Sequence, residues 1–163
     1  MASVNNQTYK NLTHYIFIDG SQYEEQTKQI LVRSPKVWQK TIKLEENVGK
    51  GWYGHRVYAA CSFLVNADVI VYLDEDNWFE SCHIQKLVDK INEGNDWAYS
   101  LRKIVSQEGR YICNDDCESL GKWDSVINDK FIDVNCFMIP KMAAIHFSPY
   151  WYRRARHPQE QPE

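Results

Sequence analysis

The chain has 163 residues, a formal net charge of −3 at pH 7 and 44% hydrophobic residues. That length suits one domain with a single core, and the composition is typical of globular chains. The balance of charge gives no electrostatic footprint for a nucleic-acid backbone. No apolar run approaches the length of a membrane span, and the N-terminus lacks a signal-peptide pattern.

The cysteines indicate a reducing compartment. Five are present, and only Cys113 and Cys117 form a close pair. A structural zinc site needs four ligands, usually in two such pairs, so we expect reduced thiols instead. We therefore predict a cytoplasmic protein with no nucleic-acid partner and no membrane span.

The first half of the chain alternates strand-like and helix-like segments. Apolar spacing predicts, in order, a strand over 14–19, a helix from Tyr23 that Pro35 ends, a strand over 41–44, a loop over 47–53, a helix over 57–64, a strand over 68–73 and a helix over 84–91. Ser21 with Glu24 has the spacing of a capping box at the first helix. Such alternation predicts a mostly parallel sheet covered by helices.

The second half has a different character. We predict two strands over 97–105 and 110–113 around a turn at 107–109, a polar loop over 114–123, a strand over 131–139, a helix over 140–146, and a short helix after Pro149 to about residue 156. The last residues, 157–163, contain two prolines and no apolar side chain. We expect one domain over 1–156 and a flexible tail over 157–163.

Three adjacent acids, Asp74, Glu75 and Asp76, directly follow the strand over 68–73. Ligands of an open parallel sheet bind beyond the carboxyl ends of its strands, and Asp19 also ends a strand. Strand alternation places Asp74 and Asp76 on one side, where two carboxylates suit a hard divalent cation. A solvated turn is the alternative, and an isolated D-x-D pattern usually is one.

Three stretches extend this pattern over residues 5–90: "NNQTYKNLTHYIFIDGS", "NVGKGWYGHRVYAACSFLVNADVIVYLDED" and "LDEDNWFESCHIQKLV". In that order they resemble the nucleotide-sugar-dependent glycosyltransferases of the GT-A fold, closest to family 2. The resemblance implies a Rossmann-like, mostly parallel GT-A sheet with helices on both faces. It also implies transfer of a sugar, in the hexosyltransferase class, from a nucleoside-diphosphate sugar, most often a UDP-sugar, to a glycan, lipid or protein acceptor.

The resemblance also implies roles for single residues. Asp76 would ligate Mn²⁺ or Mg²⁺, Asp74 would contact the metal or the ribose of the donor, and Asp19 would accept a hydrogen bond from the base. Gly20 beside Asp19 would let the base approach closely, and Glu75 lies within the acidic stretch and joins the expected donor site. His55 and Arg56 begin a helix, where a phosphate is favoured, although both are equally well explained as surface residues.

The catalytic base has two candidates, Asp116 in the polar loop and Asp133 on the strand over 131–139. A capped turn and a strand-end hydrogen bond, respectively, are the structural alternatives. The family's first strand and helix and its late acidic pair have no counterpart here, so we expect a minimal or shortened chain. The strand edges that this leaves predict a homodimer, with direct pairing of the flanking strands, which would allow a monomer, as the alternative.

Two other functions remain open. One is a catalytically impaired remnant of the fold that binds nucleotide or a partner protein. The other is a metal-dependent nucleotidyltransferase, although those enzymes usually carry a basic, glycine-rich loop after the first strand and this sequence has none.

Overall fold

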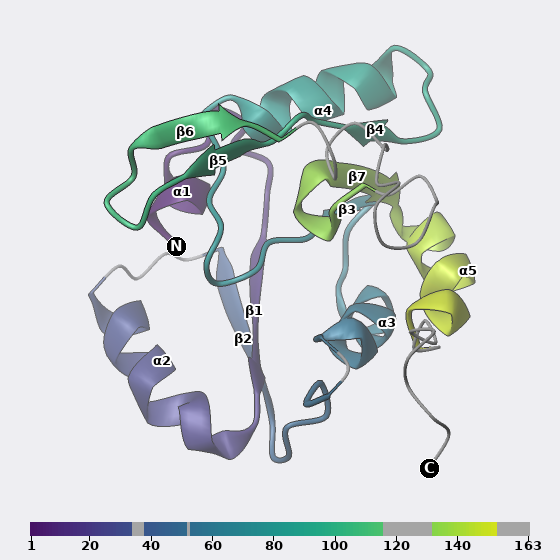
Figure 1. The fold of residues 1–163 in the computed structure, drawn as a ribbon. Helices are drawn as coiled ribbons and strands as arrows, with labels where there is room; N and C mark the ends of the chain where they lie inside the picture. Colours follow the sequence, from purple (N-terminus) through teal and green to yellow (C-terminus); the bar gives the residue numbers. More distant parts are fainter. Residues whose placement is uncertain (34–37, 52, 116–131, 153–163) are drawn as a thin grey trace, which may run out of the picture. The chain divides into compact units, whose positions relative to one another are not determined.

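The computed structural model describes residues 1–33, 38–51, 53–115 and 132–152 (Figure 1). Its backbone divides into two compact units. The first is made of Met1–Asn11 and Val69–Pro140, and the second of residues 12–68 together with 141–152. Three predictions fall outside the described residues: the base candidate Asp116, the helix beyond residue 152, and the tail over 157–163.

The second unit contains the parallel strand pair that the sequence predicts. Strands β1 (His14–Asp19) and β2 (Gln39–Leu44) pair in parallel from His14 opposite Gln39 to Asp19 opposite Leu44. A 3₁₀ turn, η1 (Ser21–Tyr23), and helix α2 (Glu24–Val32) lie between them in the chain. Because the strands are parallel, both carboxyl ends lie at one edge, and Asp19 is the last residue of β1 there.

The predicted capping box does not form. Neither η1 nor α2 has a side-chain hydrogen bond at its N-cap. Glu24, the expected acidic member, instead pairs with Lys28 at 2.7 Å and with Lys43 of β2 at 3.2 Å. The Glu24 carboxylate thus links α2 to β2. In the first turn, the Tyr23 backbone N–H donates to the Gly20 carbonyl.

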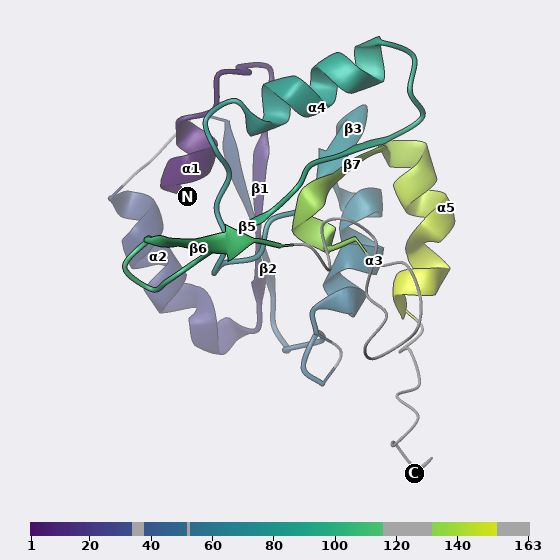
Figure 2. The same cartoon turned by 45° about the horizontal axis from the view of Figure 1, so that its top comes forward.

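Helices α3 (His55–Leu64) and α5 (Lys141–Tyr152) lie side by side in the second unit (Figures 1 and 2). The sequence predicted a break at Pro149, but α5 continues through it. Proline inside a helix costs about 3 kcal/mol, so tertiary contacts must hold the last turn. The Trp151 ring supplies them, with its centroid 5.6 Å from that of His55 and 5.5 Å from that of Tyr58.

The first unit contains a three-stranded sheet in the order β3 (Val69–Val71), β7 (Phe137–Pro140), β4 (Ala98–Tyr99). Both neighbours of β7 pair with it antiparallel. Strands β3 and β4 are therefore parallel to each other and joined through α4 (His83–Asn92), as the alternation predicted. The expectation of a mostly parallel sheet is nevertheless wrong for this unit, because a strand from late in the chain inserts between them.

The core of the first unit lies between α4 and one face of this sheet. Ile84 and Leu87 are the buried residues of α4, and Ala98 and Met138 are buried on the adjacent strands. Ala98 and Met138 are also a register pair of β4 and β7. Because side chains alternate along a strand, the neighbouring Tyr99 and Phe137 form the pair on the opposite face.

The N-terminal segment is tied to the beginning of α4 by one buried side chain. Gln7 follows the short helix α1 (Ala2–Asn5), donates to the Ser3 and Glu80 carbonyls at 2.9 and 2.8 Å, and accepts from the Ile84 backbone N–H at 3.0 Å. The last bond satisfies one of the donors that a helix N-terminus leaves open. Gln7 thereby fixes Glu80 and Ile84, which follow the acidic stretch at residues 74–76 in the chain.

The predicted hairpin forms between β5 (Lys103–Val105) and β6 (Tyr111–Asn114), but the predicted strand over 97–105 is broken, because β4 at its start pairs with β7 instead. The predicted strand over 131–139 is only partly correct. Within its described part, Val134–Cys136 form a 3₁₀ turn, η2, and only β7 is extended. The Asp133 side chain accepts from the Asn135 backbone N–H at 2.9 Å, and such local capping competes with a strand ladder.

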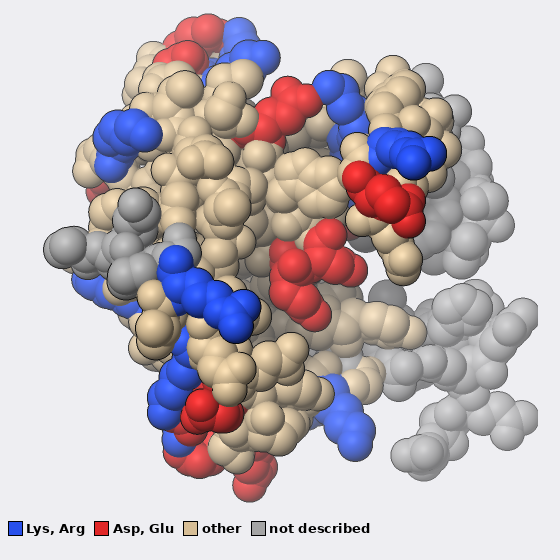
Figure 3. All heavy atoms as spheres, turned by 90° about the vertical axis from the view of Figure 1, so that its left-hand side faces the viewer, with Lys and Arg blue, Asp and Glu red and all other residues tan. Residues whose placement is uncertain are grey.

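The distribution of charged residues and the state of the cysteines agree with what the composition predicts. Lys and Arg are interspersed with Asp and Glu over the face drawn in Figure 3. Among the described residues no helix is long and apolar enough to cross a membrane. The four described cysteines, Cys61, Cys82, Cys113 and Cys136, are free thiols.

Candidate functional site

The acids that follow β3 lie in a turn and not on the strand itself. Strand β3 ends at Val71, and the Asn77 backbone N–H donates to the Asp74 carbonyl at 3.2 Å. We call residues 74–77 the acid turn. Strand alternation therefore does not apply to Asp74 and Asp76, which lie two positions apart in one turn. Asp74 is half-buried, whereas Glu75 and Asp76 are exposed.

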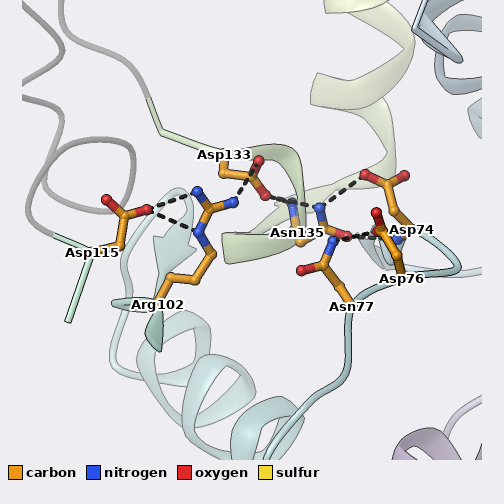
Figure 4. Close-up of polar contacts among 7 residues, drawn as sticks. All are labelled: Asp74, Asp76, Asn77, Arg102, Asp115, Asp133 and Asn135. Atoms are coloured by element: carbon orange, nitrogen blue, oxygen red, sulfur yellow. Dashed lines mark hydrogen bonds and ion pairs between the residues drawn. The ribbon is translucent and has the colours of Figure 1, made fainter. Parts of the chain in front are cut away.

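Asn135 of η2 holds Asp74 at two points (Figure 4). The Asp74 backbone N–H donates to Asn135 Oδ1 at 2.6 Å, and Asn135 Nδ2 donates to Asp74 Oδ2 at 3.0 Å. One buried amide thus fixes both the backbone and the carboxylate of Asp74. Asp76 is bound by its neighbour in sequence, because Asn77 Nδ2 donates to Asp76 Oδ1 at 2.9 Å.

The base candidate Asp133 is itself engaged on both oxygens. Its Oδ1 accepts from the backbone N–H of Asn135 at 2.9 Å and from Asn135 Nδ2 at 2.8 Å. Its Oδ2 pairs with Arg102 Nη1 at 2.9 Å. Arg102 also pairs with Asp115 Oδ2, through Nη2 at 2.7 Å and Nε at 2.9 Å. We call Arg102, Asp115 and Asp133 the arginine cluster.

The arginine cluster joins two places far apart in the sequence. Asp115 follows β6 and Asp133 precedes η2, so Arg102 draws together the two residues that flank 116–132. The acid turn and the arginine cluster together contain five carboxylates, those of Asp74, Glu75, Asp76, Asp115 and Asp133, and one guanidinium; Figure 4 draws all of these except Glu75. The excess of negative charge among these residues favours a cation at the acid turn.

The buried thiol beside this network is protonated at neutral pH. Burial, with a smaller contribution from the charge of Asp133, raises the pKa of Cys136 to about 11. Because the thiolate is the reactive and ligating form, Cys136 acts here as a small core residue. The oxygen and amide groups around it supply the polar chemistry of the site.

Asp19, expected in the donor pocket, holds a loop of its own unit. Its Oδ1 accepts from the Val48 backbone N–H and its Oδ2 from the Gly49 backbone N–H, each at 2.8 Å. A Cβ atom on Gly49 would lie 2.5 Å from Asp19 Oδ2, so only glycine permits this approach. The glycine-containing loop that the sequence singled out is thus fixed by the aspartate at the end of β1.

The remaining donor-site candidates also belong to the second unit. Gly20 is buried, with φ of 116°, a conformation that favours glycine. His55 and Arg56 do begin α3, as predicted, after Gly54 in the left-handed conformation. The His55 ring packs against Tyr58 and Trp151, with centroids 6.2 and 5.6 Å away, so His55 has a packing role as well.

The sequence found the acid turn and Asp133 but did not assign roles to Asn135, Arg102 and Asp115. A signal for the last two exists in principle. Arg102 falls within the predicted strand over 97–105, Asp115 follows the predicted strand over 110–113, and a buried charge needs an opposite partner. The partner of Asp74 has no such signal, because Asn135 lies 61 positions away.

The acid turn carries the oxygen groups that hard cations prefer. Within the described parts of the chain, no three His, Cys, Asp or Glu side chains are grouped as a complete metal site. Mg²⁺ and similar ions are commonly held by one or two carboxylates, with substrate phosphates and water completing the shell. Asp74 and Asp76 provide that number of oxygen ligands in one turn.

Comparison with known proteins identifies the class. The acid turn at the end of a buried strand, within a mixed α/β chain, is a feature of nucleotide-sugar glycosyltransferases. The model of "Glycosyl transferase family 2" matches residues 1–153, so the chain belongs to glycosyltransferase family 2 and the predicted resemblance is confirmed. Membership implies the GT-A fold. No curated protein matches the chain.

Proposed function

We propose that this protein transfers a sugar, as a hexosyltransferase, from a nucleoside-diphosphate sugar to an acceptor glycan, lipid or protein. The observation that carries the proposal is the acid turn, fixed by Asn135, in a chain that matches the family over residues 1–153. UDP is the proposed nucleotide, because it is the commonest in the family. The match spans both compact units, which supports treating residues 1–156 as one functional domain.

Asp76 and Asp74 are the proposed ligands of Mn²⁺ or Mg²⁺. When bound, the ion neutralises the charge that grows on the leaving diphosphate. The chain's own contribution is to hold the carboxylates in place before the donor arrives, which Asn135 does for Asp74. Glu75, exposed within the same turn, is proposed to contact the donor.

The family resemblance gives the second unit the nucleotide part of the donor. Asp19 would act through the loop at Val48 and Gly49 that its carboxylate already holds, with Gly20 beside it. His55 and Arg56 at the start of α3 would favour the diphosphate. The general base is proposed to be Asp116 or Asp133, the two acids that the sequence selects.

Calorimetric titration of the protein with UDP, GDP and ADP, and with the corresponding nucleoside triphosphates and nucleotide sugars, each with Mn²⁺ and with EDTA, tests this function. We expect binding of one nucleoside diphosphate that weakens at least tenfold in EDTA. Preference for nucleoside triphosphates over nucleotide sugars would favour the nucleotidyltransferase alternative. No nucleotide binding in either condition would contradict the proposal.

Self-association is the second expected property. Strand β4 pairs only with β7 among the described strands, and Trp97 just before it and Tyr99 at its end are 47% and 44% exposed. Exposed apolar edges favour pairing with another chain. Light scattering at micromolar concentration should give twice the chain mass of 19.3 kDa. Tyr99→Lys should shift the mass toward that of one chain, and a wild-type mass near 19.3 kDa would contradict the prediction.

A further inference from the structure

The hydrogen bonds of the first unit form one continuous path from the arginine cluster to the acid turn (Figure 4). Arg102 is held by Asp115, Asp133 is held by Arg102, and Asn135 is held by Asp133. Asn135 then holds Asp74 through both ends of its amide. Every step is 3.0 Å or shorter.

The chemistry of the groups fixes the direction of this path. A carboxylate only accepts hydrogen bonds, and a guanidinium only donates them. Asn135 lies between two carboxylates, so its NH₂ group faces both Asp133 Oδ1 and Asp74 Oδ2 while its oxygen takes the Asp74 backbone N–H. No other orientation of the amide satisfies all three contacts.

Charge explains why the path needs Arg102. Asp133 and Asp74 both approach the Asn135 amide, and Asp115 adds a further buried carboxylate to the group. The Arg102 guanidinium pairs with both Asp115 and Asp133. The negative charge of Asp133, the acid that contacts Asn135, is therefore compensated by Arg102. The Asp74 carboxylate is thus bound by the neutral amide of Asn135. That amide is in turn bound by Asp133, which forms an ion pair with Arg102.

We infer that Asn135 is a positioning residue for Asp74 and that Asp133 and Arg102 keep Asn135 in place for it. The inference rests on the proposed function, because it assigns Asp74 to the metal and the donor. It gives Asp133 a role different from that of general base, and it leaves Asp116 as the acid for that step. Groups that orient metal ligands in this way typically change metal affinity 10–100-fold when removed.

The first test measures Mn²⁺ binding directly, from the loss of the electron paramagnetic resonance signal of free Mn²⁺ in the presence of UDP. Asn135→Ala should raise the Mn²⁺ dissociation constant about 10–100-fold. UDP binding in EDTA should change much less, because that binding does not involve the metal. Asn95→Ala is the matched control, since Asn95 is an exposed asparagine of the same unit that donates only to the Lys90 carbonyl.

A second variant keeps the inference testable if Asn135→Ala does not fold. Asp133→Asn preserves size and an acceptor oxygen but removes the charge that binds Arg102 and orients Asn135. Positioning predicts that Asp133→Asn weakens Mn²⁺ binding in the same direction. A general base predicts lost turnover with unchanged Mn²⁺ affinity, and that result would overturn the inference.

The outcomes separate the inference from the function beneath it. Wild-type protein that binds Mn²⁺ with UDP, together with Asn135→Ala and Asp133→Asn proteins that bind it equally well, overturns the positioning role alone. Wild-type protein that binds no Mn²⁺ overturns the proposed function and the positioning role together. Weakened binding in both variants, with wild-type behaviour of Asn95→Ala, supports both.

Discussion

Replacing Asp76 by alanine is expected to weaken Mn²⁺-dependent binding of a nucleoside diphosphate at least about 100-fold, or about 2.8 kcal/mol. The acid turn offers two carboxylates, and Asp76 is the exposed one, so its loss removes half of the protein's proposed ligand charge. The stability of the fold should change by less than about 0.5 kcal/mol, as is usual for exposed positions. Calorimetry with Mn²⁺, combined with thermal unfolding, measures both quantities.

Asp96→Ala provides the control for Asp76→Ala. Asp96 is an exposed aspartate of the same unit, in the loop between α4 and β4, and no function is proposed for it. Its replacement should leave nucleotide and Mn²⁺ binding within about twofold of wild type, since each tenfold change requires 1.4 kcal/mol. Equal binding by the wild-type and Asp76→Ala proteins would remove Asp76 from the metal site.

Replacing Arg102 by methionine is expected to destabilise the protein by about 3–5 kcal/mol. The Asp115 and Asp133 side chains that it pairs with are only 6% and 18% exposed. Removing the guanidinium leaves both carboxylates with little water and without their cation, which costs far more than the intact ion pair contributes. Urea unfolding at pH 7 should show a lower midpoint with an unchanged slope.

The neighbouring Lys103 gives a matched control. Lys103 pairs with Glu80 at 2.6 Å, a shorter contact than any in the arginine cluster, but both side chains are more than half exposed. Exposed ion pairs contribute little to stability, so Lys103→Met should unfold close to wild type. If both variants unfold alike, burial is not what makes the arginine cluster important.

Segments with strong local signals were predictable from the sequence. Strand β1 was predicted with its observed bounds, and α3, α4 and the β5–β6 hairpin were found from apolar spacing and turn residues. Each of these elements buries one face, and the spacing of its apolar residues in the sequence indicates which face that is. The short helix α1 has only four residues, too few for any periodicity to show.

Features that depend on distant parts of the chain were not predictable in the same way. The antiparallel insertion of β7 between β3 and β4 pairs it with β3 across more than 60 residues. The continuation of α5 through Pro149 depends on Trp151 meeting His55 and Tyr58 of another helix. Local propensity is a weak guide where tertiary contacts of this kind decide the conformation.

The residues of the candidate site likewise divide into those that were predictable from the sequence and those that were not. Asp74 and Asp76 were identified because a recognisable pattern of consecutive residues carries them. Asn135 and Arg102 act through contacts with residues far away in sequence, and an asparagine or arginine on its own carries no sign of its partner. The role of Asp19 was only partly predictable, because its contact with Gly49 requires the end of β1 to meet a loop 30 residues later in the sequence.

Hydrolysis of the donor tests the central claim most directly. A nucleotide sugar matched to the nucleoside diphosphate that binds best should slowly release that diphosphate in the presence of Mn²⁺ and without an acceptor. The release should stop on addition of EDTA and in the Asp76→Ala protein, while the Asp96→Ala protein remains active. Tight Mn²⁺-dependent nucleotide binding with no release from any nucleotide sugar of a UDP, GDP and ADP panel would contradict a working glycosyltransferase and favour a nucleotide-binding remnant.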